Sequence, residues 1–214
     1  MRYIQKGNAP DGLVKYRQKP NANYTGFKKG KKRYEETKKA LCEEQGYICC
    51  YCGREIKCDE QTQIEHLYPK STEEYKEMQL DYETNLLACC DGGKADRHSR
   101  LIDKSHLFCE TVKLSKVLPV NPLMKDCQDK FLYDITGEII GVSKDAEVTI
   151  KILNLNSPII KNLRKAAIDY YENYCGDYTQ TDWINEIKRL NRKVKGKFDE
   201  FCFVSIQYIK FFKL

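Results

Sequence analysis

Residues 49–53 read Cys49-Cys50-Tyr51-Cys52-Gly53, and this run places Cys49 and Cys52 on an expected tight turn rather than on a helix. Two thiolates at that spacing can both face one tetrahedral ion, which is typical of one half of a structural zinc site. A pair of this kind also occurs in thiol redox proteins. The second cysteine cluster, Cys89-Cys90, favours zinc over the redox alternative.

The cysteine content of the whole chain supports a metal site. The 214 residues include eleven cysteines, an odd number that argues against a complete disulfide framework. No apolar run has the length of a membrane span, and residues 1–20 lack the pattern of a secretory signal. We therefore expect a soluble, cytoplasmic protein without a membrane partner, in which clustered cysteines indicate metal binding or catalysis.

The other two ligands of a tetrahedral zinc site must come from later in the chain. Cys58 is a weak candidate because it lies too close to the first pair to close a useful loop. The remaining candidates are cysteines and histidines that follow residue 85, and composition does not choose among them: Cys89, Cys90, Cys109, His98 and His106.

Positive charge is concentrated at the start of the chain. The chain has a net charge of +6, yet residues 1–40 hold twelve Lys or Arg and only three acids. Glycines, prolines and interleaved aromatics predict that residues 1–33 form an irregular arm that docks on the body and on a nucleic acid, with a solvated tail as the alternative. The expected phosphate-contacting residues of this arm are Lys28, Lys29, Lys31, Lys32 and Arg33.

Helical and strand patterns divide the rest of the chain. Good helix formers predict a helix over residues 34–45, which Gly46 ends, and a short helix over 72–79. Two apolar runs around Thr136-Gly137 predict a β-hairpin. Further helices are expected at 145–154, from Pro158 onward and from about residue 181. The last of these should bury a face made of Ile184, Ile187, Leu190 and Val194, with Trp183 on its polar side packed against the tail, and the apolar segment 198–214 should pack on the body or a partner.

Between the two cysteine clusters lies the run Ile64-Glu65-His66-Leu67-Tyr68-Pro69-Lys70. A carboxylate can hold a hard cation that neutralises a phosphate, and a neutral imidazole can take a proton from an attacking water. Glu65 and His66 therefore suit metal-assisted phosphodiester hydrolysis. Taken alone, the pair is also compatible with an ordinary surface dipeptide.

The order of these motifs resembles the HNH endonuclease superfamily, whose core is a zinc-stabilised ββα-metal fold. The resemblance rests on the Cys49–Cys52 pair, then Glu65-His66 with Pro69-Lys70, then Asn85-Leu86-Leu87-Ala88-Cys89-Cys90. It is most specific for the HNH subunit of Septu-type and retron-associated antiphage systems (PtuB-like proteins). It extends over about residues 1–175, through segments such as Asn121-Pro122-Leu123 and Ile152-Leu153-Asn154-Leu155-Asn156.

The resemblance implies a role for each matching residue. Glu65 stands at a metal-ligand position, His66 at the general base, and Asn85 at the motif position that orients the base and its loop. Glu110 matches the remaining metal-ligand position, because it follows Cys109 and precedes Lys113 by three. The family's catalytic ion is Mg²⁺ or Mn²⁺.

The same resemblance implies zinc ligation by Cys49, Cys52, Cys90 and Cys109. The chain departs from the usual pattern because an insertion separates Cys90 from Cys109, so Cys89 and His106 remain alternatives. The inserted loop is basic, and we expect it to lie on phosphates or to be a plain solvated loop. Nucleic-acid contacts in and near the core are expected from Lys70, Arg97 and Arg100.

The sequence therefore predicts an α+β protein in three parts: a basic arm (1–40), a ββα-metal HNH core with a zinc site (41–118) and a hairpin with a mainly helical C-terminal region (119–214). The resemblance implies a DNA endonuclease that works in antiphage defence with an SMC-like, ABC-type ATPase. The alternative function is a non-catalytic zinc module that binds nucleic acid or a protein partner.

Overall fold

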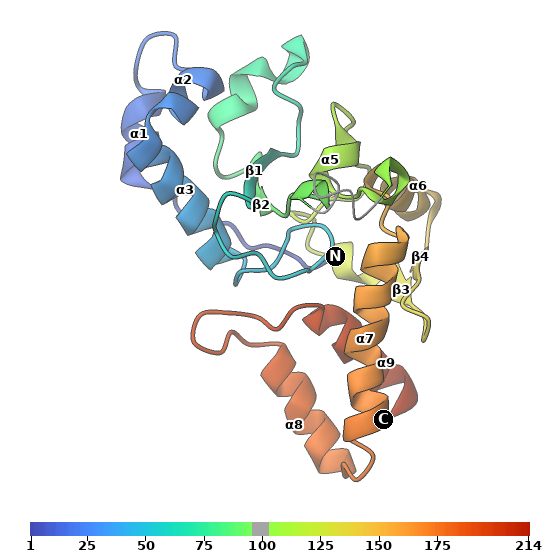
Figure 1. Cartoon of the computed structure of the whole chain (residues 1–214). Helices are drawn as coiled ribbons and strands as arrows, with labels where there is room; N and C mark the ends of the chain where they lie inside the picture. Colours follow the sequence, from blue (N-terminus) through green and yellow to red (C-terminus); the bar gives the residue numbers. More distant parts are fainter. Residues whose placement is uncertain (96–102) are drawn as a thin grey trace.

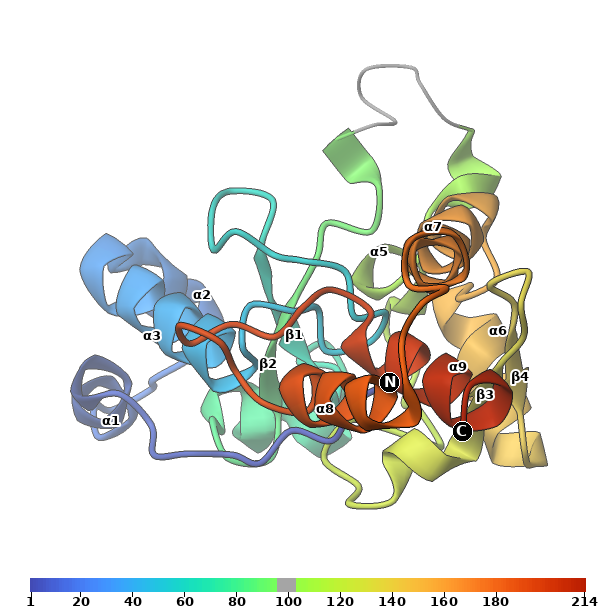
Figure 2. The same ribbon diagram turned by 90° about the horizontal axis from the view of Figure 1, so that it is seen from below.

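The centre of the molecule is a two-stranded antiparallel hairpin. The computed structural model describes residues 1–95 and 103–214 of the chain, which form a mixed α+β structure. Strand β1 (Gln63–His66) pairs with β2 (Leu86–Cys89), with Gln63 opposite Cys89 and His66 opposite Leu86. Every residue of β2 is buried, because helices lie on both sides of the hairpin (Figures 1 and 2).

The N-terminal segment is helical, which corrects the expected irregular arm. It contains α1 (Asp11–Arg17), α2 (Tyr24–Lys29) and the longer α3 (Lys31–Glu44). Leu13 and Phe27 are fully buried, and α1 and α2 both pack on α3. The N-terminal segment therefore packs on the rest of the protein, as its aromatic residues predicted. The expected boundary at residues 40–41 falls inside α3.

Short elements follow the first strand. The helix expected at 72–79 is instead a 3₁₀ helix, η1 (Glu73–Leu80). After β2 come η2 (Lys104–His106) and a single turn of α-helix, α5 (Glu110–Lys113). In the described residues these elements follow in the order β1, η1, β2, η2 and α5, and α5 is only one turn long.

The second hairpin and its helices follow the sequence prediction. Strand β3 (Phe131–Tyr133), which follows η3 (Cys127–Lys130), pairs with β4 (Ile139–Gly141), and α6 (Lys144–Leu153) and α7 (Pro158–Tyr174) come next. Arg164 of α7 is buried and joins these parts. Its Nε donates to the carbonyl oxygen of Gly137 at 2.7 Å, and its Nη2 donates to that of Leu155 at 2.7 Å.

The last two helices correct one predicted face. Helix α8 (Gln180–Leu190) begins at a capping box of Thr179 and Asp182, close to the predicted start. Trp183 is buried against Tyr171 and Tyr178, whereas Ile184 is 41% exposed. The larger ring takes the inward position, which rotates the buried face away from Ile184.

The apolar C-terminal segment packs on the body, as predicted. Helix α9 (Cys202–Phe212) buries most of its residues and contacts α7 and α8. None of the helices in the described part of the chain is both long enough and apolar enough to cross a bilayer.

Candidate metal centre and adjoining pocket

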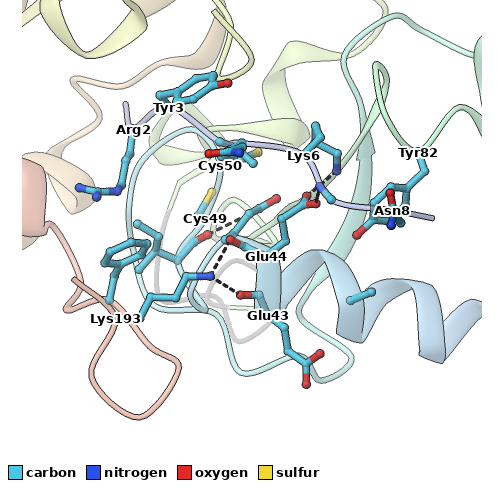
Figure 3. Close-up of a pocket in the computed structure, with 17 residues that line it drawn as sticks. Arg2, Tyr3, Lys6, Asn8, Glu43, Glu44, Cys49, Cys50, Tyr82 and Lys193 are labelled. Atoms are coloured by element: carbon cyan, nitrogen blue, oxygen red, sulfur yellow. Dashed lines mark hydrogen bonds and ion pairs between the residues drawn. The ribbon is translucent and has the colours of Figure 1, made fainter. Parts of the chain in front are cut away.

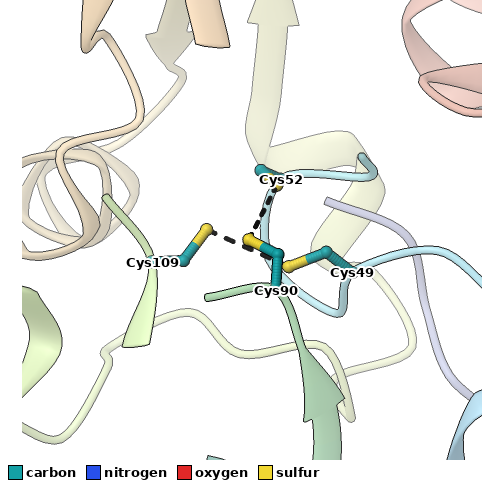
Figure 4. A group of neighbouring side chains, drawn as sticks. All are labelled: Cys49, Cys52, Cys90 and Cys109. Atoms are coloured by element: carbon teal, nitrogen blue, oxygen red, sulfur yellow. Dashed lines mark hydrogen bonds between the residues drawn. The ribbon is translucent and has the colours of Figure 1, made fainter. Parts of the chain in front are cut away.

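Four cysteines from three separate segments converge on one point (Figure 4). Cys49 and Cys52 lie in the turn after α3, Cys90 directly follows β2, and Cys109 directly precedes α5. All four are buried, and their Sγ atoms lie within 4.8 Å of one another. We call this group the cysteine tetrad. It contains Cys90 and Cys109, whereas the alternatives Cys89 and His106 lie outside it.

The spacing of the sulfur atoms in the tetrad fits a tetrahedral metal ion. The Sγ atoms of Cys49 and Cys109 are 4.0 Å apart, and those of Cys52 and Cys90 are 3.9 Å apart. A zinc ion with Zn–S bonds of about 2.3 Å separates its thiolates by about 3.8 Å. Four soft sulfur donors at this separation are compatible with structural zinc.

Neighbouring thiols lower the pKa of one cysteine of the tetrad, Cys49. Burial acts to raise the pKa of Cys49, but hydrogen bonds from neighbouring thiols, Cys109 first among them, bring that pKa well below its ordinary value. Burial raises the pKa of Cys109 itself. Hydrogen bonds within the group therefore favour the thiolate form of Cys49, and a bound metal would stabilise the thiolates of the tetrad.

The carboxylate of Glu65 is buried in an ion pair. The Nζ of Lys113 lies 2.9 Å from Oε1 of Glu65, and both side chains are almost fully buried. The hydroxyl of Tyr51 donates to the same oxygen at 2.9 Å. Burial raises the pKa of Glu65, and the charge of Lys113 opposes that rise.

His66 follows Glu65 and is held by its Nε2 atom. This nitrogen lies 3.0 Å from the carbonyl oxygen of Gln79, which makes Nε2 the protonated nitrogen of the neutral ring and leaves Nδ1 as an acceptor. The ring of Tyr24 packs edge-on against it, with ring centroids 4.4 Å apart. Burial, with the charge of Lys70, lowers the pKa of His66 to about 3, so the imidazole is neutral at pH 7.

Asn85 fixes the loop that follows β1. Its Oδ1 accepts a hydrogen bond from the backbone N–H of Tyr68 at 2.7 Å, and its Nδ2 donates to the carbonyl oxygen of Met78 at 2.8 Å. The side chain is fully buried and bonds to two positions of the segment between the strands, Tyr68 and Met78. Asn85 therefore orients this loop rather than facing a ligand.

Glu65, His66 and Glu110 line the same pocket, which has a volume of about 300 Å³. Lys70 and Lys94 also line it. Glu110 lies in the first turn of α5 and pairs with Lys94, whose Nζ is 2.9 Å from Oε2 of Glu110. The three residues to which the HNH resemblance gives catalytic roles thus line one pocket, together with two lysine side chains.

The expected nucleic-acid contacts divide into three groups. Lys28, Lys29, Lys31 and Lys32 are exposed where α2 meets α3, and Lys70 is exposed at the pocket. Arg33 is used inside the protein, because its guanidinium lies 4.2 Å from the ring of Tyr16 and donates to the carbonyl oxygen of Gly26. Arg97, Arg100 and the possible ligand His98 lie outside the described residues.

Sequence reasoning missed the residues that hold Glu65. It used Lys113 only as a spacing reference and gave Tyr51 no role beyond its place in a turn. A lysine in the turn after a clustered cysteine gives no local sign of burial, so only its contacts with Glu65 and with the carbonyl oxygen of His66, at 2.8 Å, show its role.

Comparison of the chain with protein-family models gave no match, and comparison with curated proteins gave none either.

Proposed function

We propose that the chain is a metal-dependent endonuclease of the HNH type that hydrolyses DNA phosphodiester bonds. The observation that carries this proposal is the convergence of Glu65, His66 and Glu110 on one pocket beside the cysteine tetrad. In this function the tetrad holds a structural Zn²⁺ that fixes the strands and α5.

The pocket residues suit the separate tasks of phosphodiester hydrolysis. Glu65 and Glu110 supply carboxylates to Mg²⁺ or Mn²⁺, which when bound neutralises the phosphate and the leaving oxygen. His66 is neutral and has Nδ1 available to accept the proton of the attacking water. Lys70 and Lys94 add positive charge for a phosphate at the same pocket.

The exposed lysines at the α2–α3 junction extend this charge along the surface. Tyr24 begins α2 and contacts His66, so the basic segment is anchored at the pocket itself. The backbone N–H of Tyr24 also donates to Oε1 of Gln79, the residue whose carbonyl holds His66. A DNA backbone on these lysines would therefore lead to the proposed catalytic residues.

His66→Ala tests the proposal. With plasmid DNA and Mn²⁺, the variant should nick at least about 100-fold more slowly than the parent, because the proton acceptor is lost. His106→Ala is the matched control, since His106 is half-buried and does not line the pocket. Equal nicking by parent and His66→Ala, with both folded by circular dichroism, would remove His66 from the mechanism.

One observation favours a non-catalytic zinc module that binds nucleic acid. Glu65 is already paired with Lys113, and the ring of His66 is hydrogen-bonded to Gln79, so both residues also have structural tasks. In that function the parent protein binds DNA with a strong salt dependence but leaves the plasmid intact with Mg²⁺ or Mn²⁺. The same assay therefore separates the two functions.

We further propose that the nuclease acts in antiphage defence with an SMC-like, ABC-type ATPase, and that the end of α9 contributes to the contact. Phe211 and Phe212 are 64% and 56% exposed at this end. Co-expression with an SMC-like, ABC-type ATPase should give a stable complex that Phe211→Asp weakens and Val14→Asp, on α1, does not. If no complex forms with that ATPase, this partner is wrong.

A further inference from the structure

A second group of thiols adjoins the tetrad. The Sγ atoms of Cys49, Cys50 and Cys89 lie within 4.8 Å of one another, and all three residues are buried. The distance between Cys49 and Cys89 is 3.6 Å. Cys49 belongs to both groups, so its sulfur lies between the tetrad and the additional pair.

The backbone around this group is fixed by hydrogen bonds. The N–H of Cys50 donates to the carbonyl oxygen of Ala88 at 3.1 Å, which holds the turn against β2. The side chain of Gln45 bonds to Ala88 at both its N–H, 2.7 Å, and its carbonyl oxygen, 2.8 Å. The three sulfurs are therefore brought together by a rigid part of the structure.

A pocket reaches two of these three residues, Cys49 and Cys50. Its volume is about 680 Å³, and its lining includes Cys49, Cys50, Lys6 and Glu44 (Figure 3). A metal site needs such an entry path as well as donors at suitable spacing. The distance of 3.6 Å between Cys49 and Cys89 is close to the separation of about 3.8 Å for two thiolates on one zinc ion.

We propose that Cys49, Cys50 and Cys89 form a second site for a divalent thiophilic cation, of the Zn²⁺ or Cd²⁺ kind, with Cys49 bridging to the ion of the tetrad. A fourth ligand would reach this ion from the pocket that Cys49 and Cys50 line. This site is independent of the proposed nuclease activity, because it uses none of the residues of the catalytic pocket.

Charge balance favours a divalent ion here. Four thiolates around one divalent cation carry a net charge of −2. A second divalent cation adds +2, and deprotonation of Cys50 and Cys89 adds −2, so the buried charge does not change. Binding of the second ion breaks two S–H bonds, forms metal–sulfur bonds in their place and releases two protons to solvent. A monovalent ion would instead leave additional negative charge buried.

Metal titration of the purified, reduced protein tests this inference. Cd²⁺ is added in steps, and bound metal is counted by native mass spectrometry while thiolate-to-metal absorption and proton release are followed. The parent should bind two ions per chain and release two protons with the second. Cys50→Ser and Cys89→Ser should each bind one, because the tetrad is intact in both.

Two control variants address binding elsewhere. Cys127→Ser removes a buried cysteine outside both groups, and Cys58→Ser removes a half-buried one, so both should still bind two ions. A single ion in the parent would overturn the inference and leave Cys50 and Cys89 as hydrogen-bond donors to the Cys49 thiolate. Two ions in Cys50→Ser and Cys89→Ser would place the second ion elsewhere. Thermal melting of each variant confirms that the counts refer to folded protein.

Discussion

Cys109→Ser is expected to leave the chain without a stable fold. Prolonged treatment of the parent protein with a strong zinc chelator should have the same effect. The binding free energy of a structural Zn²⁺ on four such ligands is on the order of 10 kcal/mol or more and appears as folding free energy. A domain of this size is usually stable by about 5–15 kcal/mol, so this loss removes most of its stability.

The position of the tetrad explains why the effect should be large. It joins the turn after α3, the end of β2 and the start of α5, which lie far apart in the sequence. Without a cation, four buried sulfurs would face one another in place of an apolar core. A metal ion on the tetrad would hold these three segments together.

Thermal melting followed by circular dichroism, with and without chelator, measures the effect. Cys127→Ser is the matched control, because Cys127 is equally buried but lies outside both thiol groups, and a buried hydroxyl costs about 1–3 kcal/mol. Zinc added back to the chelated parent should restore the transition. A chelated protein that melts like the untreated one, together with a Cys109→Ser variant no worse than Cys127→Ser, would rule out a structural metal here.

Half of the tetrad could be anticipated from a local signal, whereas Cys90, Cys109 and Glu110 were expected only from the resemblance in motif order. Cys49 and Cys52 lie close together on a turn that Gly53 permits through its positive φ of +80°. The resemblance in motif order indicated which side chains would meet. The HNH resemblance favoured Cys90 over Cys89 as a ligand, and the structure places Cys90 in the tetrad.

Tertiary contacts decided the parts that the sequence did not predict. Residues 1–33 read as irregular because glycine and proline weaken every helical pattern there. Burial of Leu13 and Phe27 against α3 nevertheless stabilises two short helices. The buried face of α8 likewise differs from the predicted one, because Trp183 packs against Tyr171 and Tyr178, which lie outside α8.

Lys113→Met is expected to destabilise the protein by about 3–5 kcal/mol, because it leaves the carboxylate of Glu65 buried without its counter-charge. Lys113 and Glu65 are 1% and 7% exposed, so water cannot replace the lost ammonium. The hydrogen bond from Lys113 to the carbonyl oxygen of His66 is lost as well. Urea denaturation of the two proteins measures the difference.

The pair Lys94–Glu110 provides the matched control in the same pocket. Its side chains are 43% and 30% exposed, and a pair of this kind contributes less than about 1 kcal/mol. Lys94→Met should therefore change stability only slightly. If Lys94→Met and Lys113→Met lower the free energy of unfolding equally, the buried Lys113–Glu65 pair contributes no more to stability than the exposed Lys94–Glu110 pair.

Combining Lys113→Met with Glu65→Gln should recover much of the lost stability, because the double variant buries no unpaired charge. Mn²⁺ adds a test of the proposed catalytic site. If Glu65 is a metal ligand, Mn²⁺ should stabilise Lys113→Met more than the parent, since a cation then takes the place of the ammonium beside the carboxylate. The double variant lacks that carboxylate and should show no such gain. Equal effects of Mn²⁺ on all three proteins would assign Glu65 to the structural ion pair alone and would favour the non-catalytic zinc module.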